Sequence, residues 1–254
     1  MQTKWKYAIV VGASSGIGEE VTYELARRGV SVALVGRRTE ELQRVATAAE
    51  IGSRGSGSGS RCLTYTHDVT NYSEIPELFQ RITKDLGGLD LIVYSSGVMP
   101  KIEADEYNFA KDRSMIEVNV LGGIAWLNEA AMRFQNVGGG SIVGISSIAG
   151  ERGRRGNPVY NTSKAAFSTY LESLRNRLSQ YGVNVTTIKP GVIDTPMIKG
   201  LNTAVAAYPV ADTAKQIVDA AAKGVIVKYV PSKFRIVSII LHLIPSFIFR
   251  RLNF

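Results

Sequence analysis

The feature that constrains the fold most is an apolar run that leads directly into a glycine-rich turn near the N-terminus. The largely apolar segment Lys6–Val11 predicts a buried strand, and the residues after it include Gly12, Gly16 and Gly18. Apolar residues then recur at helical spacing over Ile17–Arg28, which predicts a helix. Glycines in such a turn let the backbone approach a pyrophosphate, and the helix N-terminus offers it unpaired N–H groups. The segment therefore predicts a strand, a phosphate-binding turn and a helix.

The same alternation of apolar runs and helical patterns continues along the chain. Further strands are predicted at Val30–Val35, Cys62–Thr66, Leu89–Ser95, Ser141–Ser146, Val183–Lys189 and Val225–Val230. Helices are predicted at Thr39–Ile51, Tyr72–Leu86, Asp112–Phe134 and Ala211–Lys223, and from Asn157 onward. Strands that alternate with helices form a parallel sheet covered by helices. We therefore expect a single, doubly wound Rossmann-type α/β domain with a seven-stranded parallel sheet over residues 1–232.

Two segments stand outside this alternation. Gly52–Ser60 has low complexity and is either a domain linker or, as we expect, a mobile connection inside the domain. Residues 233–254 are strongly apolar, are flanked by basic residues and predict a helical tail that is not a separate domain. The run Ile236–Phe249 is shorter than the roughly 20 apolar residues that a membrane-spanning helix needs. The tail would lie on a membrane surface, pack against a partner subunit or cover a substrate cleft.

Composition limits the class of protein further. Hydrophobic residues make up 45% of the 254 residues, which is enough for a buried core and excludes a disordered chain. The formal charge is +8, but the basic residues are scattered without an aromatic-interleaved strip, so we expect no nucleic-acid partner. Cys62 is the only cysteine and His242 has no accompanying ligand cluster, so neither an intramolecular disulfide nor a metal site is expected. The N-terminal apolar run is too short for a signal peptide, and we expect a cytoplasmic protein.

Chemically active side chains are concentrated in residues 146–164. Tyr160 follows Ser147, and Lys164 comes four residues after Tyr160, which places the tyrosine and the lysine on one face of a helix. A phenol has a pKa of about 10, and a neighbouring ammonium group would lower it, so Tyr160 could exchange a proton near neutral pH. Ser147 could donate a hydrogen bond to a carbonyl oxygen as charge develops there. A Tyr-x-x-x-Lys pair alone is equally typical of an exposed aromatic residue beside a solvated lysine.

Further polar residues follow the predicted strands or interrupt a helix. Arg37 and Arg38 stand where dinucleotide-binding folds often place an acid, and guanidinium groups can bind a 2′-phosphate, so the pair favours NADP over NAD. The alternative is a solvated basic turn. Asp68 would accept a hydrogen bond from an adenine amino group or cap the following helix. Asn119 lies inside a predicted helix although asparagine is a modest helix former, which predicts a buried hydrogen bond or a functional role.

Together these motifs resemble those of the short-chain dehydrogenase/reductase family over nearly the whole predicted domain. The cofactor-binding residues that the resemblance implies are Gly12, Ser14, Ser15, Gly16, Ile17, Gly18, Asp68, Val69, Ser96, Gly97, Tyr160, Lys164, Pro190, Gly191, Ile193 and Thr195. The catalytic residues that it implies are Asn119, Ser147, Tyr160 and Lys164. One motif departs from the family, which usually has Asn-Asn-Ala-Gly where this chain has Tyr94-Ser95-Ser96-Gly97. The asparagines that brace this strand end are therefore missing.

The resemblance implies reversible hydride transfer between a nicotinamide and a carbonyl group or secondary alcohol. Tyr160 would give its proton to the developing alkoxide, and Lys164 would lower the pKa of Tyr160 and bind the nicotinamide ribose. Ser147 would polarise the carbonyl, and Asn119 would hold a water in a proton relay.

In the same resemblance, Ile193 and Thr195 would position the nicotinamide carboxamide. The family implies a homodimer or homotetramer, and the two arginines lead us to expect NADPH and reduction as the usual direction.

The substrate is less constrained. Pro196–Pro209 is small and apolar with few charges, which indicates a lipophilic small molecule. Two alternatives stay open: a reductase of 3-oxoacyl thioesters, and a non-catalytic NADPH-binding sensor or scaffold. A membrane-anchored structural protein would rest on the tail alone.

Overall fold

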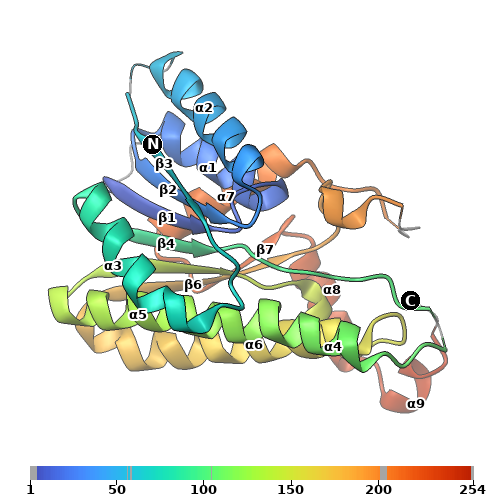
Figure 1. Cartoon of the computed structure of the whole chain (residues 1–254). Helices are drawn as coiled ribbons and strands as arrows, with labels where there is room; N and C mark the ends of the chain where they lie inside the picture. Colours follow the sequence, from blue (N-terminus) through green and yellow to red (C-terminus); the bar gives the residue numbers. More distant parts are fainter. Residues whose placement is uncertain (1–4, 56, 58, 104, 201–204, 253–254) are drawn as a thin grey trace.

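The centre of the molecule is a seven-stranded parallel sheet, seen in a computed structural model that describes residues 5–252 except 56, 58, 104 and 201–204 (Figure 1). The strands are β1 (Tyr7–Val11), β2 (Ser31–Gly36), β3 (Cys62–Thr66), β4 (Leu91–Tyr94), β5 (Gly140–Ile145), β6 (Val183–Pro190) and β7 (Val227–Val230). Their order is β3-β2-β1-β4-β5-β6-β7, so the direction of progress along the sheet reverses between β1 and β4. Ligands of such sheets bind at the carboxyl ends of the strands beside this reversal. The predicted parallel sheet is confirmed.

Helices cover both faces of the sheet (Figure 1). One layer contains α1 (Gly16–Arg27), α2 (Thr39–Gly55) and α7 (Val210–Ala222), and the other contains α3 (Ile75–Leu86), α4 (Phe109–Ile116), α5 (Gly122–Val137) and α6 (Pro158–Leu178). Side chains alternate along each strand, so one strand supplies both layers with apolar residues. In β1, Ala8 and Val10 pack toward α1, whereas Ile9 and Val11 pack toward α3 and α5.

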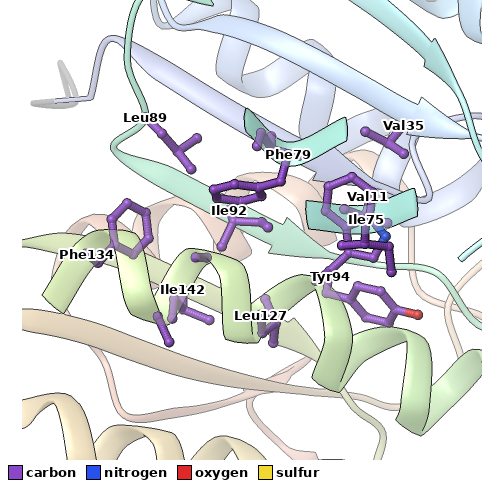
Figure 2. Packing of buried hydrophobic residues seen from close by; sticks show 14 of the residues in the cluster. Val11, Val35, Ile75, Phe79, Leu89, Ile92, Tyr94, Leu127, Phe134 and Ile142 are labelled. Carbon is purple, nitrogen blue, oxygen red and sulfur yellow. The ribbon is translucent and has the colours of Figure 1, made fainter. Parts of the chain in front are cut away.

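The largest aromatic side chains lie between the sheet and the layer of α3 and α5. Phe79 of α3 and Phe134 of α5 are buried, and Figure 2 shows them packed with Ile92 and Ile142 of the sheet. Trp126 of α5 is fully buried in the same cluster. Burying one such side chain contributes about 1.5–3 kcal/mol, so this layer holds the strand ends in fixed positions.

The helix predicted over Asp112–Phe134 is not continuous. It divides into α4, a π-helical turn over Glu117–Leu121 and α5. The close approach of α5 to α6 depends on Gly123, where a Cβ atom would lie 2.6 Å from the ring of Phe167 in α6. The prediction of one regular helix was therefore wrong in its middle, which is where Asn119 lies.

The low-complexity stretch Gly52–Ser60 begins as part of a helix. Helix α2 continues to Gly55, and Ser60 is buried, with its hydroxyl donating to the Ala26 carbonyl oxygen at 2.7 Å. The stretch predicted as a mobile connection is therefore helical up to Gly55 and buried at Ser60, while residues 56 and 58 lie outside the described part.

The C-terminal tail forms α8 (Phe234–Leu243) and α9 (Ser246–Phe249), which lie beside the loop after β5 (Figure 1). Arg152 of that loop donates to the carbonyl oxygens of Leu241 and Ile244, and its guanidinium lies 3.9 Å from the centre of the Phe249 ring. The tail is thus attached to the body by polar contacts around the end of α8. Among the helices of the described residues, none is long and apolar enough to cross a membrane.

Candidate active site

A cleft of about 610 Å³ opens at the carboxyl ends of the strands beside the topological reversal. Every predicted site residue lines this cleft except Gly18 and Asn119, which are buried behind its wall. Among the described residues, none of the C-terminal tail lines it. The prediction that the tail covers the substrate cleft therefore has no support in this part of the chain.

The turn after β1 requires glycine for steric reasons. Gly12 has a φ of +90°, and a Cβ atom there would lie 2.5 Å from the backbone nitrogen of Ser96. A Cβ atom on Gly18 would lie 2.2 Å from the carbonyl oxygen of Gly12. The side chain of Ser15 makes no capping hydrogen bond, so α1 begins with N–H groups available at the cleft. This arrangement fits the pyrophosphate of a dinucleotide.

A basic edge borders the glycine turn. Arg38 donates to the main-chain oxygen of Ser14 at 3.1 Å, to the Ser14 hydroxyl at 2.9 Å and to the Ser15 hydroxyl at 2.8 Å. Arg37 is exposed and lies 3.7 Å from a carboxylate oxygen of Asp68. The two guanidinium groups therefore stand beside the turn that would hold a pyrophosphate.

Asp68 closes a local turn and does not cap the helix predicted at Tyr72–Leu86. Its Oδ1 accepts from the N–H of Thr70 at 3.0 Å and from the Thr70 hydroxyl at 2.9 Å. Burial raises the pKa of Asp68, but the Thr70 hydrogen bonds and the Arg37 charge outweigh this and hold it below its ordinary value. Asp68 is therefore an anion at the rim of the cleft.

Ser147, Tyr160 and Lys164 meet in the cleft. Ser147 follows β5, and Tyr160 lies in the first turn of α6 because Asn157 caps that helix by accepting from the Tyr160 N–H at 3.1 Å. The side chain of Ser147 lies close enough to Tyr160 to lower the pKa of its hydroxyl. The Nζ atom of Lys164 lies 5.8 Å from the centre of the Tyr160 ring, as expected for two residues one turn apart.

Burial shifts the pKa of both Tyr160 and Lys164. Burial raises the pKa of Tyr160 above its ordinary value, and the hydrogen bond with Ser147 and the charge of Arg154 offset only part of this rise. The Nζ atom of Lys164 donates to the Ile145 carbonyl oxygen at 3.1 Å. Burial also lowers the pKa of Lys164 to about 8. Tyr160 is thus held as a phenol, the form that can donate a proton.

The hydrogen bonds of Asn119 account for its position in the π-helical turn. It is fully buried; its Nδ2 donates to the Val98 carbonyl oxygen and to the Ser163 hydroxyl, each at 3.0 Å, and its Oδ1 accepts from the Val98 N–H at 2.8 Å. Both amide protons are therefore used to tie the segment after β4 to α6. The predicted buried hydrogen bond is present.

Tyr94 braces the strand end where the family's asparagines are missing. Its ring is fully buried beside Phe167, and its hydroxyl donates to the Val118 carbonyl oxygen at 2.5 Å. Figure 2 shows this hydroxyl at the edge of the apolar cluster. A carbonyl group inside the π-helical turn is thereby satisfied. The sequence analysis missed this role, and the only available signal was a tyrosine inside an otherwise aliphatic strand.

The loop after β6 lies against the glycine turn. A Cβ atom on Gly16 would lie 3.3 Å from Cγ2 of Thr195, and the Thr195 hydroxyl donates to the Ile193 carbonyl oxygen at 3.3 Å. Gly191 packs against the ring of Phe234, a residue of the tail. A Cβ atom on Gly191 would lie 2.2 Å from this ring. The segment Pro196–Pro209 continues from this loop, and its residues 201–204 lie outside the described chain.

The remaining part of the cleft wall contains residues that the sequence analysis missed. It is mainly apolar, with Val98, Met99, Ile148, Met197 and Ile198, and it also contains Arg154 and Asn157. The apolar composition of Pro196–Pro209 indicated only Met197 and Ile198. The others lie in loops whose paths the sequence pattern does not determine.

The fold and the cleft define a Rossmann-type protein built to bind a nucleotide at the strand ends. Residues 6–206 match the family model described as short chain dehydrogenase. The chain belongs to the short-chain dehydrogenase/reductase family, and it is an oxidoreductase of the kind that uses NAD(H) or NADP(H).

Individual relatives agree with this assignment. An uncharacterized oxidoreductase of Myxococcus xanthus is 36% identical over 196 residues, which are 77% of this chain and 75% of the relative. An uncharacterized oxidoreductase of Staphylococcus epidermidis is 32% identical over 199 residues, covering 78% and 83% of the two chains. A short-chain type dehydrogenase/reductase from Mycobacterium ulcerans superposes with a TM-score of 0.81 at 26% identity, over 91% of this chain and 90% of that structure.

Proposed function

We propose that the protein reduces a carbonyl group on an apolar small molecule with NADPH, in a reaction that is chemically reversible. The observation that supports this most is the meeting of Ser147, Tyr160 and Lys164 in the cleft that also contains the glycine turn. A sensor or scaffold has no need for an acid, a hydrogen-bond donor and a cation assembled in this way. The enzyme hypothesis is therefore preferred over the non-catalytic one.

The proposed roles follow from the geometry of the three side chains. Tyr160 is a phenol with a raised pKa, so it holds a proton that it can give to an alkoxide oxygen as charge develops there. Ser147 donates a hydrogen bond to the same oxygen. The Lys164 ammonium supplies positive charge next to Tyr160, and a bound nicotinamide would supply or accept the hydride.

Asn119 acts in this scheme by positioning its neighbours. Because both of its amide protons are used by Val98 and Ser163, a relay water would have to bind the amide oxygen or the main chain of Asn119. The same hydrogen bonds hold α6, which carries Tyr160 and Lys164, against the segment after β4.

NADPH is the proposed cofactor because the edge of the cleft is cationic. Arg38 is already oriented by two serine hydroxyls, and Arg37 stands beside it, so a 2′-phosphate would meet two guanidinium groups. The one acid at this edge that lines the described cleft, Asp68, is engaged by Thr70 and Arg37. A ribose with a free 2′-hydroxyl would find no comparable carboxylate at the end of β2.

The decisive measurement is fluorescence titration of the purified protein with NADPH and NADH, followed by NADPH oxidation with a panel of aldehydes and ketones. Loss of one charge-assisted contact costs about 1.5–3 kcal/mol, so Arg38→Ala is expected to weaken NADPH binding about 10- to 100-fold and to leave NADH binding nearly unchanged. Equal binding of both cofactors by the unmodified protein would refute the NADP proposal.

The variant Tyr160→Phe distinguishes the enzyme hypothesis from the hypothesis of a non-catalytic sensor. This variant should bind NADPH as the unmodified protein does but lose turnover by at least about 10²- to 10⁴-fold, because the proton donor is gone. Retained turnover in Tyr160→Phe would contradict the proposed mechanism.

The tail is proposed to rest on an anionic membrane surface. Several of its large apolar side chains are exposed, among them Leu243 at 74%, Ile236 at 64% and Phe247 at 57%. Basic residues stand at both ends of this apolar face: Lys233, Arg235, Arg250 and Arg251. An apolar face bordered by cations is complementary to anionic lipid headgroups above an acyl layer. We place the protein in the cytoplasm, peripherally bound to that surface.

Vesicle sedimentation tests the membrane proposal. The protein should sediment with phosphatidylcholine vesicles that contain phosphatidylserine and should be released by replacing Ile236, Leu243 and Phe247 together with serine. Met132→Ser removes an exposed apolar residue from α5 and serves as the matched control. The proposal fails if the protein does not bind the vesicles and the triple substitution instead converts an oligomer into monomers. The apolar face would then be a contact between two copies of the chain.

Assembly into a dimer or tetramer is also proposed, through the outer faces of α5 and α6. Light scattering of the protein in solution tests this, and a monomer at all concentrations would refute it.

A further inference from the structure

In the loop between Ser147 and Tyr160, one cationic side chain lines the cleft and has no ion pair within the described residues. This side chain is Arg154. Its neighbours in the loop point elsewhere: Arg152 binds the carbonyl oxygens at the end of α8, and Arg155 donates to the carbonyl oxygen of Arg250. Arg154 is therefore the member of this basic loop that faces the reacting groups.

The contacts of Arg154 leave its charge unbalanced. Its guanidinium reaches the Oδ1 atom of Asn161 at 3.5 Å, and no ion pair joins it to a carboxylate in the described chain. The nearest acid in sequence, Glu151, pairs instead with Lys189 at 2.6 Å. Arg154 is only partly exposed, and burial lowers its pKa. A partly desolvated cation without a counter-charge is costly unless a ligand supplies one.

The acidic residue that lines the described cleft, Asp68, lies at the other end of the cleft from Arg154. Asp68 follows β3, whereas the Arg154 loop follows β5, and three strands separate them in the sheet order. The lining of the same cleft includes the apolar side chains of Met99, Ile148 and Met197. The cleft therefore presents an apolar surface with one positive group beside the hydroxyls of Ser147 and Tyr160.

We propose that the substrate is a carbonyl compound with an apolar body and one carboxylate, and that Arg154 binds the carboxylate while Ser147 and Tyr160 bind the carbonyl oxygen. This inference rests on the proposed reductase function and names its substrate class. A carboxylate matches one planar guanidinium in charge and shape. A phosphate dianion would keep a second charge that this single guanidinium does not balance. Arg154 is a specificity-determining residue in this scheme.

Matched probes isolate the contribution of the charge. The rates of NADPH oxidation are compared for 3- and 4-formylbenzoate and for their methyl esters, which differ chiefly in the negative charge. The unmodified enzyme should prefer the acids, and Arg154→Met should lower the acid-to-ester ratio of kcat/KM by about 10- to 100-fold, the range for one hydrogen-bonded charge pair. Arg154→Lys should retain part of the preference. Arg155→Met removes the neighbouring charge outside the cleft and should leave the ratio unchanged.

Two results would overturn the inference. The first is an unmodified enzyme that turns over the esters as well as the acids. The second is an Arg154→Met enzyme that loses both activities equally, with its pH profile shifted to higher pH. In that case the charge of Arg154 acts on Tyr160 and not on the substrate.

Binding distinguishes this failure from failure of the reductase function. Calorimetric titration with the alcohols 3- and 4-(hydroxymethyl)benzoate and with their esters needs no turnover. Tighter binding of the acids that is lost in Arg154→Met would support the carboxylate site even if no aldehyde is reduced, and the reductase proposal would then fail alone. Equal binding of acids and esters by the unmodified protein would refute the carboxylate site.

Discussion

Replacing Lys164 with methionine should stabilise the folded protein while it abolishes turnover. Lys164 is 5% exposed, and burial lowers the pKa of its ammonium group from 10.5 to about 8. A shift of this size corresponds to about 3 kcal/mol of unfavourable free energy at pH 7, since one pKa unit is about 1.4 kcal/mol. Methionine fills similar space without charge, although it loses the hydrogen bond to the Ile145 carbonyl oxygen.

The pH dependence of the stability difference distinguishes the cost of burying the Lys164 charge from the effect of the lost hydrogen bond. Below pH 8, Lys164 is protonated in both the folded and the unfolded chain, and the full penalty is present. Between pH 8 and 10.5 the folded state loses this proton first, so the stability of the unmodified protein rises with pH relative to Lys164→Met. The penalty falls from about 3 kcal/mol at pH 7 to about 2 at pH 9 and about 1 at pH 10. The lost hydrogen bond adds a constant that does not change this slope.

Urea unfolding at pH 7, 9 and 10, followed by circular dichroism, measures the effect. The stability difference between Lys164→Met and the unmodified protein should decrease by about 2 kcal/mol from pH 7 to pH 10. Lys215→Met, which removes an exposed lysine of α7, should show no such trend. A stability difference for Lys164→Met that is constant with pH would refute the argument that the cation is desolvated.

Three further outcomes are expected. Gly12→Ala should abolish cofactor binding and destabilise the protein, because a Cβ atom would lie 2.5 Å from the Ser96 nitrogen at a φ of +90°; titration and thermal melting check this. Tyr94→Phe should cost about 1–3 kcal/mol in urea unfolding, because the buried Val118 carbonyl oxygen loses its donor, and an unchanged stability would contradict the bracing role. Cys62 should react slowly with iodoacetamide at pH 8, because burial and then the charge of Glu50 raise its pKa to about 12; a rate like that of free cysteine would contradict this.

The sequence predicted the parts of the molecule that follow from periodic patterns and tight turns. The strands and the glycine turn are local features, because apolar runs and steric restrictions at Gly12 and Gly18 determine them. The pairing of Tyr160 with Lys164 follows from helical spacing, and Ser147 lies at the end of a predicted strand. These residues were therefore placed correctly in one cleft.

The features that the sequence did not predict depend on contacts between distant segments. The break in the helix at Asn119 is stabilised by Val98, Ser163 and Tyr94, none of which is near it along the chain. The raised pKa of Tyr160 depends on how deeply the side chain is buried, which no pattern in the loop from Ser147 to Tyr160 reveals.

The sequence also could not predict that Arg154 faces the cleft. Arg152, Arg154 and Arg155 occur close together, and only tertiary contacts decide which of them faces it. Arg152 and Arg155 are held by the tail through α8 and residue Arg250.

The π-helical turn at Glu117–Leu121 has a further consequence for how this protein could change. Such a turn is equivalent to one extra residue inserted in an α-helix, and each residue turns a helix by about 100°. Helices α4 and α5 are therefore out of phase, so that α4 can face α6 while α5 faces the sheet. Deleting any one residue of the turn would restore the phase of a regular helix and turn α4 away from α6. The length of this segment therefore sets the angle between the two helices, independently of the hydrogen bonds that Asn119 makes within it.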